Sequence, residues 1–254
     1  MLNQVTSTSI ILDVQGLSGG YDRRRPVLHQ ISFQVKAGEL IGIIGLNGAG
    51  KSTTIKHILG ILQPVEGKIY VNGKELQENP EAYHRSIAYI PEAPFVYEDL
   101  TLWEHLQLTA MAYGLSKEVF EQRVHPLLER FQMSERVSFF PGQMSKGMRQ
   151  KVMIINAFLV QPQLLIVDEP FVGLDPLAMR EIMDLLIEAK ERGTAILMSS
   201  HILPAAEQHG DRFIILHQGR VRMEGSLQEL RQSVGQPAIT LEDLFLHVIK
   251  DELP

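Results

Sequence analysis

The 254-residue sequence lacks cysteine, has one tryptophan and contains no long uninterrupted apolar run. The absence of cysteine excludes disulfide bonds and thiolate-ligated metal sites, and no pair of histidines has the spacing of a zinc site. The longest apolar stretches, 152–160 and 164–167, are interrupted by Asn156 and by residues 161–163. They fall far short of the roughly 20 residues that a membrane-spanning helix needs, so we expect any membrane span to belong to another chain.

The sequence also lacks an excess of positive charge. Its formal net charge is −6 at pH 7, which provides no general basic surface, so we expect no nucleic-acid partner. The basic run at residues 23–25 is either a solvated turn or a contact for nucleotide or lipid phosphate. The first residues show no basic stretch followed by a long apolar run, so no signal peptide is predicted.

A glycine-rich octapeptide, GLNGAGKS at residues 45–52, follows the apolar run 40–44. A strand, a glycine-rich loop and a helix are the context of a phosphate-binding loop, in which successive backbone N–H groups point at phosphate oxygens. Lys51 would reach the terminal phosphates and Ser52 would bind Mg²⁺. A glycine-rich turn that only caps a helix is the alternative. The residues predicted to surround the nucleotide phosphates are Gly45, Asn47, Gly48, Ala49, Gly50, Lys51, Ser52 and Thr53.

Two adjacent carboxylates follow a second apolar run. Residues 164–167 are predicted to form a buried parallel strand that delivers Asp168 and Glu169 at its C-terminal end. Downstream of a phosphate loop, Asp168 would hold Mg²⁺ through water, and Glu169 would polarise the attacking water as a general base. Taken alone, an acidic pair after a strand is more often a helix cap.

A third segment, MSKGMRQ at residues 144–150, places Ser145 23 residues before Asp168. Ser145 suits a helix N-cap, and the apolar residues after it have helical spacing. The segment resembles the signature sequence of ATP-binding cassette (ABC) proteins, and the resemblance implies that Ser145 and Gly147 contact nucleotide. An ordinary capped helix would use the same residues.

The resemblance assigns roles to three further residues. Asp175, within residues 173–176, resembles the D-loop residue that contacts the opposite subunit, although it is also a good helix N-cap. His201, after the strand pattern 195–200, resembles the switch histidine that senses the terminal phosphate and takes part in catalysis. Tyr21 resembles the aromatic residue that stacks on adenine, and core packing is the alternative.

Two positions depart from the ABC pattern. Glu92 stands where the family usually carries a glutamine near the metal. A carboxylate is a harder, charged oxygen ligand for Mg²⁺, so Glu92 is predicted to keep the metal-binding and coupling role with altered metal dependence. Lys146 stands where the commonest pattern has glycine, and it either adds a cation near the phosphates or faces solvent.

The hydrophobic patterns predict an α/β protein. An antiparallel layer is indicated by alternating patterns at 10–14, 31–35 and 68–71, the last of which ends in an Asn-Gly turn. The region 94–160 is predicted to be mainly helical, with a capping box at Thr101 and Glu104 and a helix stop at Gly114. From residue 164 onward strand and helix patterns alternate, which implies a largely parallel sheet.

The resemblance makes this architecture more specific. It implies a P-loop NTPase core of mainly parallel sheet, with an antiparallel β layer and an inserted helical subdomain, which is the ABC ATPase fold. One ATPase domain would span residues 8–225, with the helical subdomain at approximately 94–160. A C-terminal helical extension would span residues 226–254.

The resemblance also implies ATP and Mg²⁺ as ligands and a head-to-tail homodimer, in which Ser145 and Gly147 of one subunit close over ATP held by Lys51 of the other. Within the family, the sequence resembles bacterial exporter ATPases on the runs 89–92, 145–151 and 241–246. Its resemblance to the Ecs type rests on the runs 45–56, 101–116, 146–157 and 214–218. Such subunits work at the cytoplasmic face of the membrane, bound to a separate multi-span permease. The permease would dock near residues 92–103, where Phe95, Val96 and Trp103 could form an apolar floor or belong to the core.

A soluble ABC ATPase that acts as an assembly or regulatory factor is the alternative function, because the motifs specify ATP binding and hydrolysis but not the process that hydrolysis drives. A nucleotide-binding scaffold without turnover is disfavoured, since Lys51, Asp168, Glu169 and His201 are all present.

Overall fold

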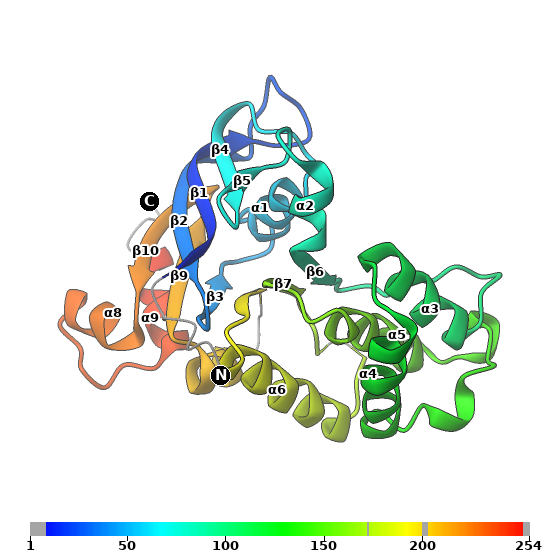
Figure 1. Ribbon diagram of the computed structural model, residues 1–254. Helices are drawn as coiled ribbons and strands as arrows, with labels where there is room; N and C mark the ends of the chain where they lie inside the picture. The colour runs from blue at the N-terminus through cyan, green and yellow to red at the C-terminus, as the bar shows by residue number, and fades with distance from the viewer. Residues whose placement is uncertain (1–8, 172, 200–202, 251–254) are drawn as a thin grey trace.

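The computed structural model describes residues 9–171, 173–199 and 203–250, which form two β-sheets with helices around them (Figure 1). The larger sheet has six strands in the order β10-β9-β3-β8-β7-β6. All neighbouring strands in it are parallel except the antiparallel pair β9 and β10, so the predicted largely parallel sheet is confirmed. Its strands are β3 (Leu40–Ile44), β6 (Ile87–Ile90), β7 (Leu164–Asp168), β8 (Ala195–Ser199), β9 (Arg212–His217) and β10 (Arg220–Gly225).

The smaller sheet is the predicted antiparallel layer, with strand order β2-β1-β4-β5. Val71 pairs with Lys74 across a two-residue turn, in which Asn72 and Gly73 have φ angles of 51° and 73°. Positive φ at both central residues is the geometry that an Asn-Gly pair favours in a tight hairpin. Its strands are β1 (Ile10–Gly19), β2 (Leu28–Lys36), β4 (Glu66–Val71) and β5 (Lys74–Glu75).

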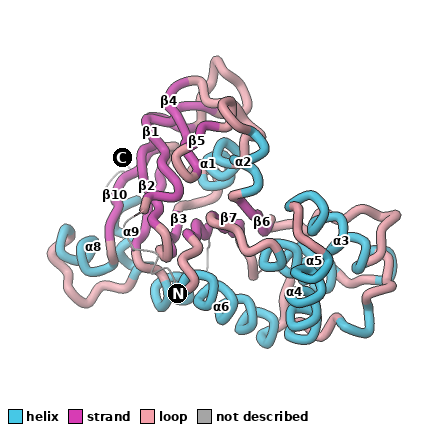
Figure 2. The backbone as a smooth tube through the Cα atoms, in the orientation of Figure 1, coloured by secondary structure: helices cyan, strands magenta, loops and turns pink. Residues whose placement is uncertain are grey.

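Three helices form a group beside β6, which we call the helical lobe (Figures 1 and 2). The lobe contains α3 (Leu102–Tyr113), α4 (Lys117–Arg130) and α5 (Lys146–Leu159), with short 3₁₀ turns at Ser134–Arg136 and Pro141–Gln143. The remaining helices are α1 (Lys51–Ile58), α2 (Pro80–Arg85), α6 (Pro176–Glu191), α7 (Leu203–His209), α8 (Leu227–Ser233) and α9 (Leu241–Lys250). Figure 1 shows α8 beside β10, on the side of the molecule away from the lobe.

Local sequence signals define the first helix of the lobe. The Thr101 side chain accepts a hydrogen bond from the Glu104 N–H, and the Glu104 carboxylate accepts one from the Thr101 N–H, which completes the predicted capping box. Gly114 ends α3 in the left-handed conformation, with φ 71°. Because this conformation strains residues with a Cβ atom, glycine is the natural stop there.

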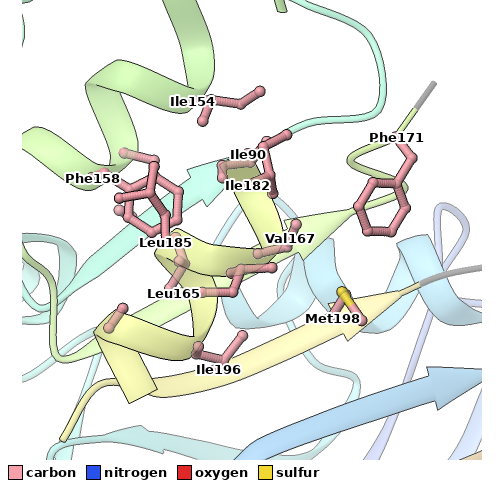
Figure 3. Packing of buried hydrophobic residues seen from close by; sticks show 14 of the residues in the cluster. Ile90, Ile154, Phe158, Leu165, Val167, Phe171, Ile182, Leu185, Ile196 and Met198 are labelled. Carbon is pink, nitrogen blue, oxygen red and sulfur yellow. The ribbon is translucent and has the colours of Figure 1, made fainter. Parts of the chain in front are cut away.

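A continuous apolar core joins the helical lobe to the larger sheet. Figure 3 shows side chains of α5, α6 and β7 meeting in this core, including Phe158, Leu185 and Val167. Trp103 packs edge-on against Phe120 at a ring distance of 5.1 Å, so it belongs to the lobe's packing, whereas Phe95 is 71% exposed. The core holds the carboxyl ends of the parallel strands in fixed register.

An ion-pair cluster also connects the lobe to the rest of the chain. Arg130 of α4 binds Glu181 and Glu188 of α6, each at 2.9 Å. Within the described ranges, no helix is both long enough and apolar enough to cross a membrane.

Candidate functional site

The register of three adjacent strands defines the edge where the candidate residues meet. Ile43 of β3 and Asp168 of β7 both pair with Ser199 of the strand between them, β8. Since strands lie about 4.8 Å apart, the glycine-rich loop that follows β3 and the carboxylates that follow β7 emerge about 10 Å apart. The carboxyl edge of a parallel sheet is where ligands bind in α/β folds.

The loop between β3 and α1 requires glycine at positions where its backbone closely approaches other atoms. A Cβ atom on Gly45 would lie 2.6 Å from the carbonyl oxygen of Leu216, and one on Gly50 would lie 2.6 Å from a methyl carbon of Leu28. Gly48 and Gly50 have φ angles of 82° and 113°. Residues 46–48 are exposed at the tip, so the loop presents its backbone to the outside.

Lys51 and Ser52 begin α1 and have opposite environments. Lys51 is only 8% exposed, and its Nζ donates to the Gly45 carbonyl at 2.7 Å, which folds the ammonium group over the loop. Ser52 is exposed, whereas Thr53 is buried and the Thr54 hydroxyl donates to Gly50 O at 2.9 Å. Ser52 is therefore the hydroxyl of this run that an external ligand can reach.

Asp168 is a nearly buried carboxylate, 5% exposed, with one hydroxyl bound to it and a second hydroxyl nearby. Ser199 Oγ donates to Asp168 Oδ1 at 2.5 Å, and the Tyr89 hydroxyl lies 3.5 Å from Oδ2. Burial, followed by the negative charges of Asp168 and Glu92, raises the pKa of the Tyr89 hydroxyl, so Tyr89 remains a neutral donor. The two hydroxyls therefore hold the carboxylate in an orientation from which it can present oxygen to a cation.

Glu169 has an unusual backbone conformation directly after the strand. Its φ is 48°, in the left-handed region that residues other than glycine rarely adopt. Its N–H donates to the Ser199 carbonyl at 3.1 Å and also lies 3.2 Å from Ser199 Oγ. Such conformations cost about 1–3 kcal/mol and tend to occur at functional sites. The turn projects a half-buried side chain from the end of β7.

Glu92 follows β6, the neighbour of β7, and its side chain is exposed. Its charge acts on Tyr89, the residue that also contacts Asp168, so Glu92 lies near the same edge. The adjacent Pro91 carbonyl accepts a 2.9 Å hydrogen bond from the fully buried Gln150 of α5. This contact ties the loop that carries Glu92 to the helix that begins at Ser145.

Ser145 is the N-cap of α5, because its hydroxyl accepts a hydrogen bond from the Met148 N–H at 3.2 Å. A Cβ atom on Gly147 would lie 2.8 Å from the Gly173 carbonyl, so the start of α5 packs directly on the backbone that leads to Asp175. The exposed Lys146 lays its aliphatic carbons near Gly173. The start of α5 is therefore in direct contact with the segment that leads into α6.

Asp175 connects the same two helices through charge. It caps α6 by accepting a hydrogen bond from the Ala178 N–H at 2.9 Å, and Lys151 Nζ lies 3.5 Å from its other oxygen. The hydrogen bond from Ala178, with a further contribution from Lys151, lowers the pKa of the Asp175 carboxyl.

Tyr21 lies on the turn after β1 and is 64% exposed, so the core alternative for it is wrong. Lys56 of α1 donates to its hydroxyl at 2.9 Å, and the ammonium lies 5.1 Å from the ring centre. The aromatic ring is thereby attached to the helix that carries Lys51 and Ser52. His201 lies outside the described residues.

Sequence reasoning missed two residues that organise this edge, Ser199 and Gln150. Ser199 ends an otherwise apolar strand, and that position at a carboxyl edge is the signal that could have identified it. Gln150 carries no comparable signal, because its contact with Pro91 joins residues 59 positions apart.

The residues present fit a nucleoside triphosphate with Mg²⁺. The exposed loop backbone and Lys51 suit phosphate oxygens, while the Ser52 hydroxyl and the Asp168 carboxylate are hard oxygen ligands. No cluster of three or more histidine, aspartate or glutamate side chains forms a metal cage in the described part of the chain. Mg²⁺ suits such a sparse site, since it usually binds one or two protein oxygens together with substrate phosphates.

Comparisons of sequence and of structure both find ABC transporter ATP-binding proteins. A family model described as ABC transporter matches residues 28–172. The chain is 53% identical over 242 residues to the ABC-type transporter ATP-binding protein EcsA of Bacillus subtilis (strain 168), covering 95% of this chain and 98% of that protein. A solved structure of an ATP-binding subunit of an ABC transporter has a TM-score of 0.92 and 51% identity, covering 94% of this chain and 99% of that chain. A dimeric ATP-binding cassette in a post-hydrolysis state with ADP and Pi has a TM-score of 0.77 and 25% identity, covering 85% of this chain and 99% of that chain.

Proposed function

We propose that this chain, which belongs to the ABC transporter family, is the ATP-hydrolysing motor of a bacterial exporter and drives a separate multi-span permease. ATP binding, ATP hydrolysis and the role of transporter subunit follow from the family and from the relatives that share most of the chain. The exporter direction, the permease as a separate chain, Mg²⁺ and the individual residue roles are the further steps of the proposal.

One observation carries the residue roles: Lys51, Ser52, Asp168 and Glu169 lie at the carboxyl edge of three consecutive strands. Lys51 and the loop amides would hold the β- and γ-phosphates. Ser52 would hold Mg²⁺, Asp168 would hold it through water, and Glu92 would lie at its margin. Bound Mg²⁺ would neutralise charge that develops on the phosphate oxygens. Glu169 would accept the proton of the attacking water, and Tyr21 would stack on adenine.

The placement of the helical lobe in the described part of the chain supports a head-to-tail homodimer. The lobe, whose helix α5 begins beside Ser145 and contains Gly147, lies apart from α1, the helix that follows the phosphate loop (Figure 1). A second copy would bring these residues, at a helix N-terminus, over ATP held by Lys51. The similar cassette that was solved as a dimer with ADP and Pi supports the dimer itself. His201 and Asp175 would complete the site as phosphate sensor and cross-subunit contact.

An exposed apolar surface beside the Glu92 loop suits the permease. Phe95 packs against Tyr97 at a ring distance of 5.8 Å, and Tyr97 stacks on His105 of α3 at 6.0 Å, one turn before the exposed Leu108. Met111 lies three positions after Leu108, and Phe95 is 71% and Met111 76% exposed. Exposed apolar side chains that adjoin one another mark interaction sites. We place the protein at the cytoplasmic face of the membrane, held there by its permease.

Polar substitution of this surface should release the permease. We expect Phe95→Ser combined with Met111→Ser to abolish co-purification with the membrane protein, because the contact loses its apolar centre. Ile10→Ser is the matched control, since Ile10 is an exposed apolar residue on β1, outside this surface. If the unaltered chain, the double variant and Ile10→Ser all recover the permease equally, the permease does not dock on this surface.

Co-purification is also the test of the function as a whole. The tagged Glu169→Gln chain would be recovered from detergent-solubilised membranes of its source cell, with and without ATP, and its partners identified. A single stoichiometric multi-span protein supports the transporter motor. Recovery of soluble partners alone would favour an ABC ATPase that acts as an assembly or regulatory factor.

Glu92→Gln tests the departure from the family pattern. Removal of a charged oxygen near the metal should raise the Mg²⁺ concentration for half-maximal ATP turnover by about tenfold. Glu98→Gln is the matched control, because Glu98 lies on the same loop but pairs with Arg149, at 3.9 Å. Identical Mg²⁺ dependence and identical transport coupling in Glu92→Gln and the unaltered protein would refute a metal role for Glu92.

For domain organisation, we propose an ATPase domain over residues 8–225, with the helical subdomain at approximately 94–160, and a C-terminal extension over 226–254. Helices α8 and α9 support the extension, since both follow the last strand. Glu207 of α7 links them to the ATPase domain by binding Arg231 and the Leu241 N–H, each at 2.9 Å.

A further inference from the structure

We propose that Ser199 is a positioning residue for both carboxylates of the ATP site, fixing Asp168 through its hydroxyl proton and Glu169 through its two oxygen atoms. This inference rests on the proposed roles of Asp168 in holding Mg²⁺ and of Glu169 in activating water.

Ser199 is a polar exception in an apolar strand. The other residues of β8 are Ala195, Ile196, Leu197 and Met198, all fully buried, and Ser199 is also 0% exposed. A buried hydroxyl costs free energy unless it forms hydrogen bonds, so an apolar residue would be the simpler choice for this position. The hydrogen bonds of Ser199 must therefore offset the cost of burying its hydroxyl.

Those contacts use the donor position and one acceptor position of the side-chain hydroxyl. Ser199 Oγ donates its proton to Asp168 Oδ1 at 2.5 Å and accepts from the Glu169 N–H at 3.2 Å. The Ser199 carbonyl accepts from the same N–H at 3.1 Å. A hydroxyl has one donor and two acceptor positions, so one serine can serve both carboxylate-bearing residues at once.

The bond to Asp168 fixes which oxygen is available. The proton from Ser199 occupies a lone pair of Oδ1, and the Tyr89 hydroxyl lies 3.5 Å from Oδ2, beyond the usual range of a strong hydrogen bond. Oδ2 is therefore the oxygen left with most of its charge for a cation. Partners of this kind, which orient a metal ligand without touching the metal, typically change metal affinity or activity by about 10- to 100-fold when removed.

The bonds to Glu169 stabilise its unusual backbone. Both Ser199 oxygens receive the N–H of a residue with φ 48°, a conformation that glutamate does not favour. By holding this N–H, Ser199 fixes where the chain turns after β7 and thus where the Glu169 side chain begins. Ser199 also pairs with Ile43, two residues before the phosphate loop, so one residue contacts both the strand that leads to this loop and the strand that carries Asp168.

Ser199→Ala tests the inference in the full-length chain. We expect Mn²⁺, used as a spectroscopic probe for the Mg²⁺ site in the presence of ADP, to bind about 10- to 100-fold more weakly. ATP turnover should fall over a similar range, while ADP affinity measured in EDTA stays unchanged. Ser199→Cys keeps one donor group on Cβ, although the thiol is larger and donates a weaker hydrogen bond, so its Mn²⁺ affinity should lie between those of alanine and serine.

Thr194→Ala is the matched control, because Thr194 is a buried hydroxyl immediately before the opposite end of β8 and donates to Pro162 O at 3.1 Å. It should lower the melting temperature without changing Mn²⁺ affinity or turnover. If Ser199→Ala behaves in the same way, Ser199 has only a structural role and the inference is overturned. Lys51→Ala and Glu169→Gln test the ATP site itself. If both variants also retain full turnover, these residues do not form the ATP site, and the proposed function is overturned along with the role of Ser199.

Discussion

Replacement of Glu169 by glutamine is expected to reduce ATP hydrolysis by about a hundredfold to ten-thousandfold, the usual contribution of a positioned general base. Glutamine keeps the shape of the side chain but cannot accept a proton from water. The phosphate loop is unchanged in this variant, so ATP should still bind. Because hydrolysis is what separates the proposed dimer, Glu169→Gln should accumulate as an ATP-bound dimer.

Phosphate release measures the first effect, and light scattering coupled to gel filtration, with and without ATP, measures the second. Glu121→Gln is a matched control, because Glu121 lies on the surface of α4, paired with His125 at 2.9 Å, outside the sheet edge. A Glu169→Gln protein that stays monomeric at saturating ATP and keeps full turnover would show that Glu169 is not the base.

Replacement of Lys51 by alanine should act earlier, at the binding of phosphate. A hydrogen bond to a charged group contributes about 1.5–3 kcal/mol, so ATP affinity should fall by about 10- to 100-fold, and turnover and dimer formation should fall with it. The buried stem of Lys51 contributes little to the core, because its ammonium group is held by loop carbonyls. The fold should therefore persist, which circular dichroism can establish.

Nucleotide titration separates Lys51→Ala from Glu169→Gln, since only the first should lose affinity. Lys117→Ala is the control for loss of a lysine, because Lys117 is exposed at the first position of α4. If Lys51→Ala binds ATP as tightly as the unaltered chain, the phosphate loop is not the nucleotide site.

Much of this architecture could be predicted from local patterns. The Asn72-Gly73 turn and the capping box at Thr101 depend on residues within four positions of each other, and both are confirmed. The order of the phosphate loop, signature segment and carboxylate pair predicted the ABC family and the ABC ATPase fold, which the family match and the structural similarity confirm. The residue roles within the site stay predictions.

Contacts between distant segments could not be predicted in the same way. Ser199 meets Asp168 across 31 positions, and Gln150 meets Pro91 across 59, because the strand order places them together. A sequence pattern states which residues favour a strand but not which strand becomes its neighbour. The exposure of Tyr21 likewise depends on its position beyond β1, which periodicity does not define.

The packing of Gly147 on Gly173, together with the pair of Lys151 and Asp175, has a thermodynamic consequence for a two-copy assembly. In the proposed dimer, Gly147 serves the nucleotide of one site, while Asp175 lies on the segment that follows Glu169 of the other. Because these contacts join the two segments, a shift of one segment on nucleotide binding should displace the other, and we expect occupancy of one site to change the affinity of the second. Linkage requires this effect to be reciprocal and equal in both directions, so ATP binding to the dimer should be cooperative, with neither nucleotide bound independently of its neighbour.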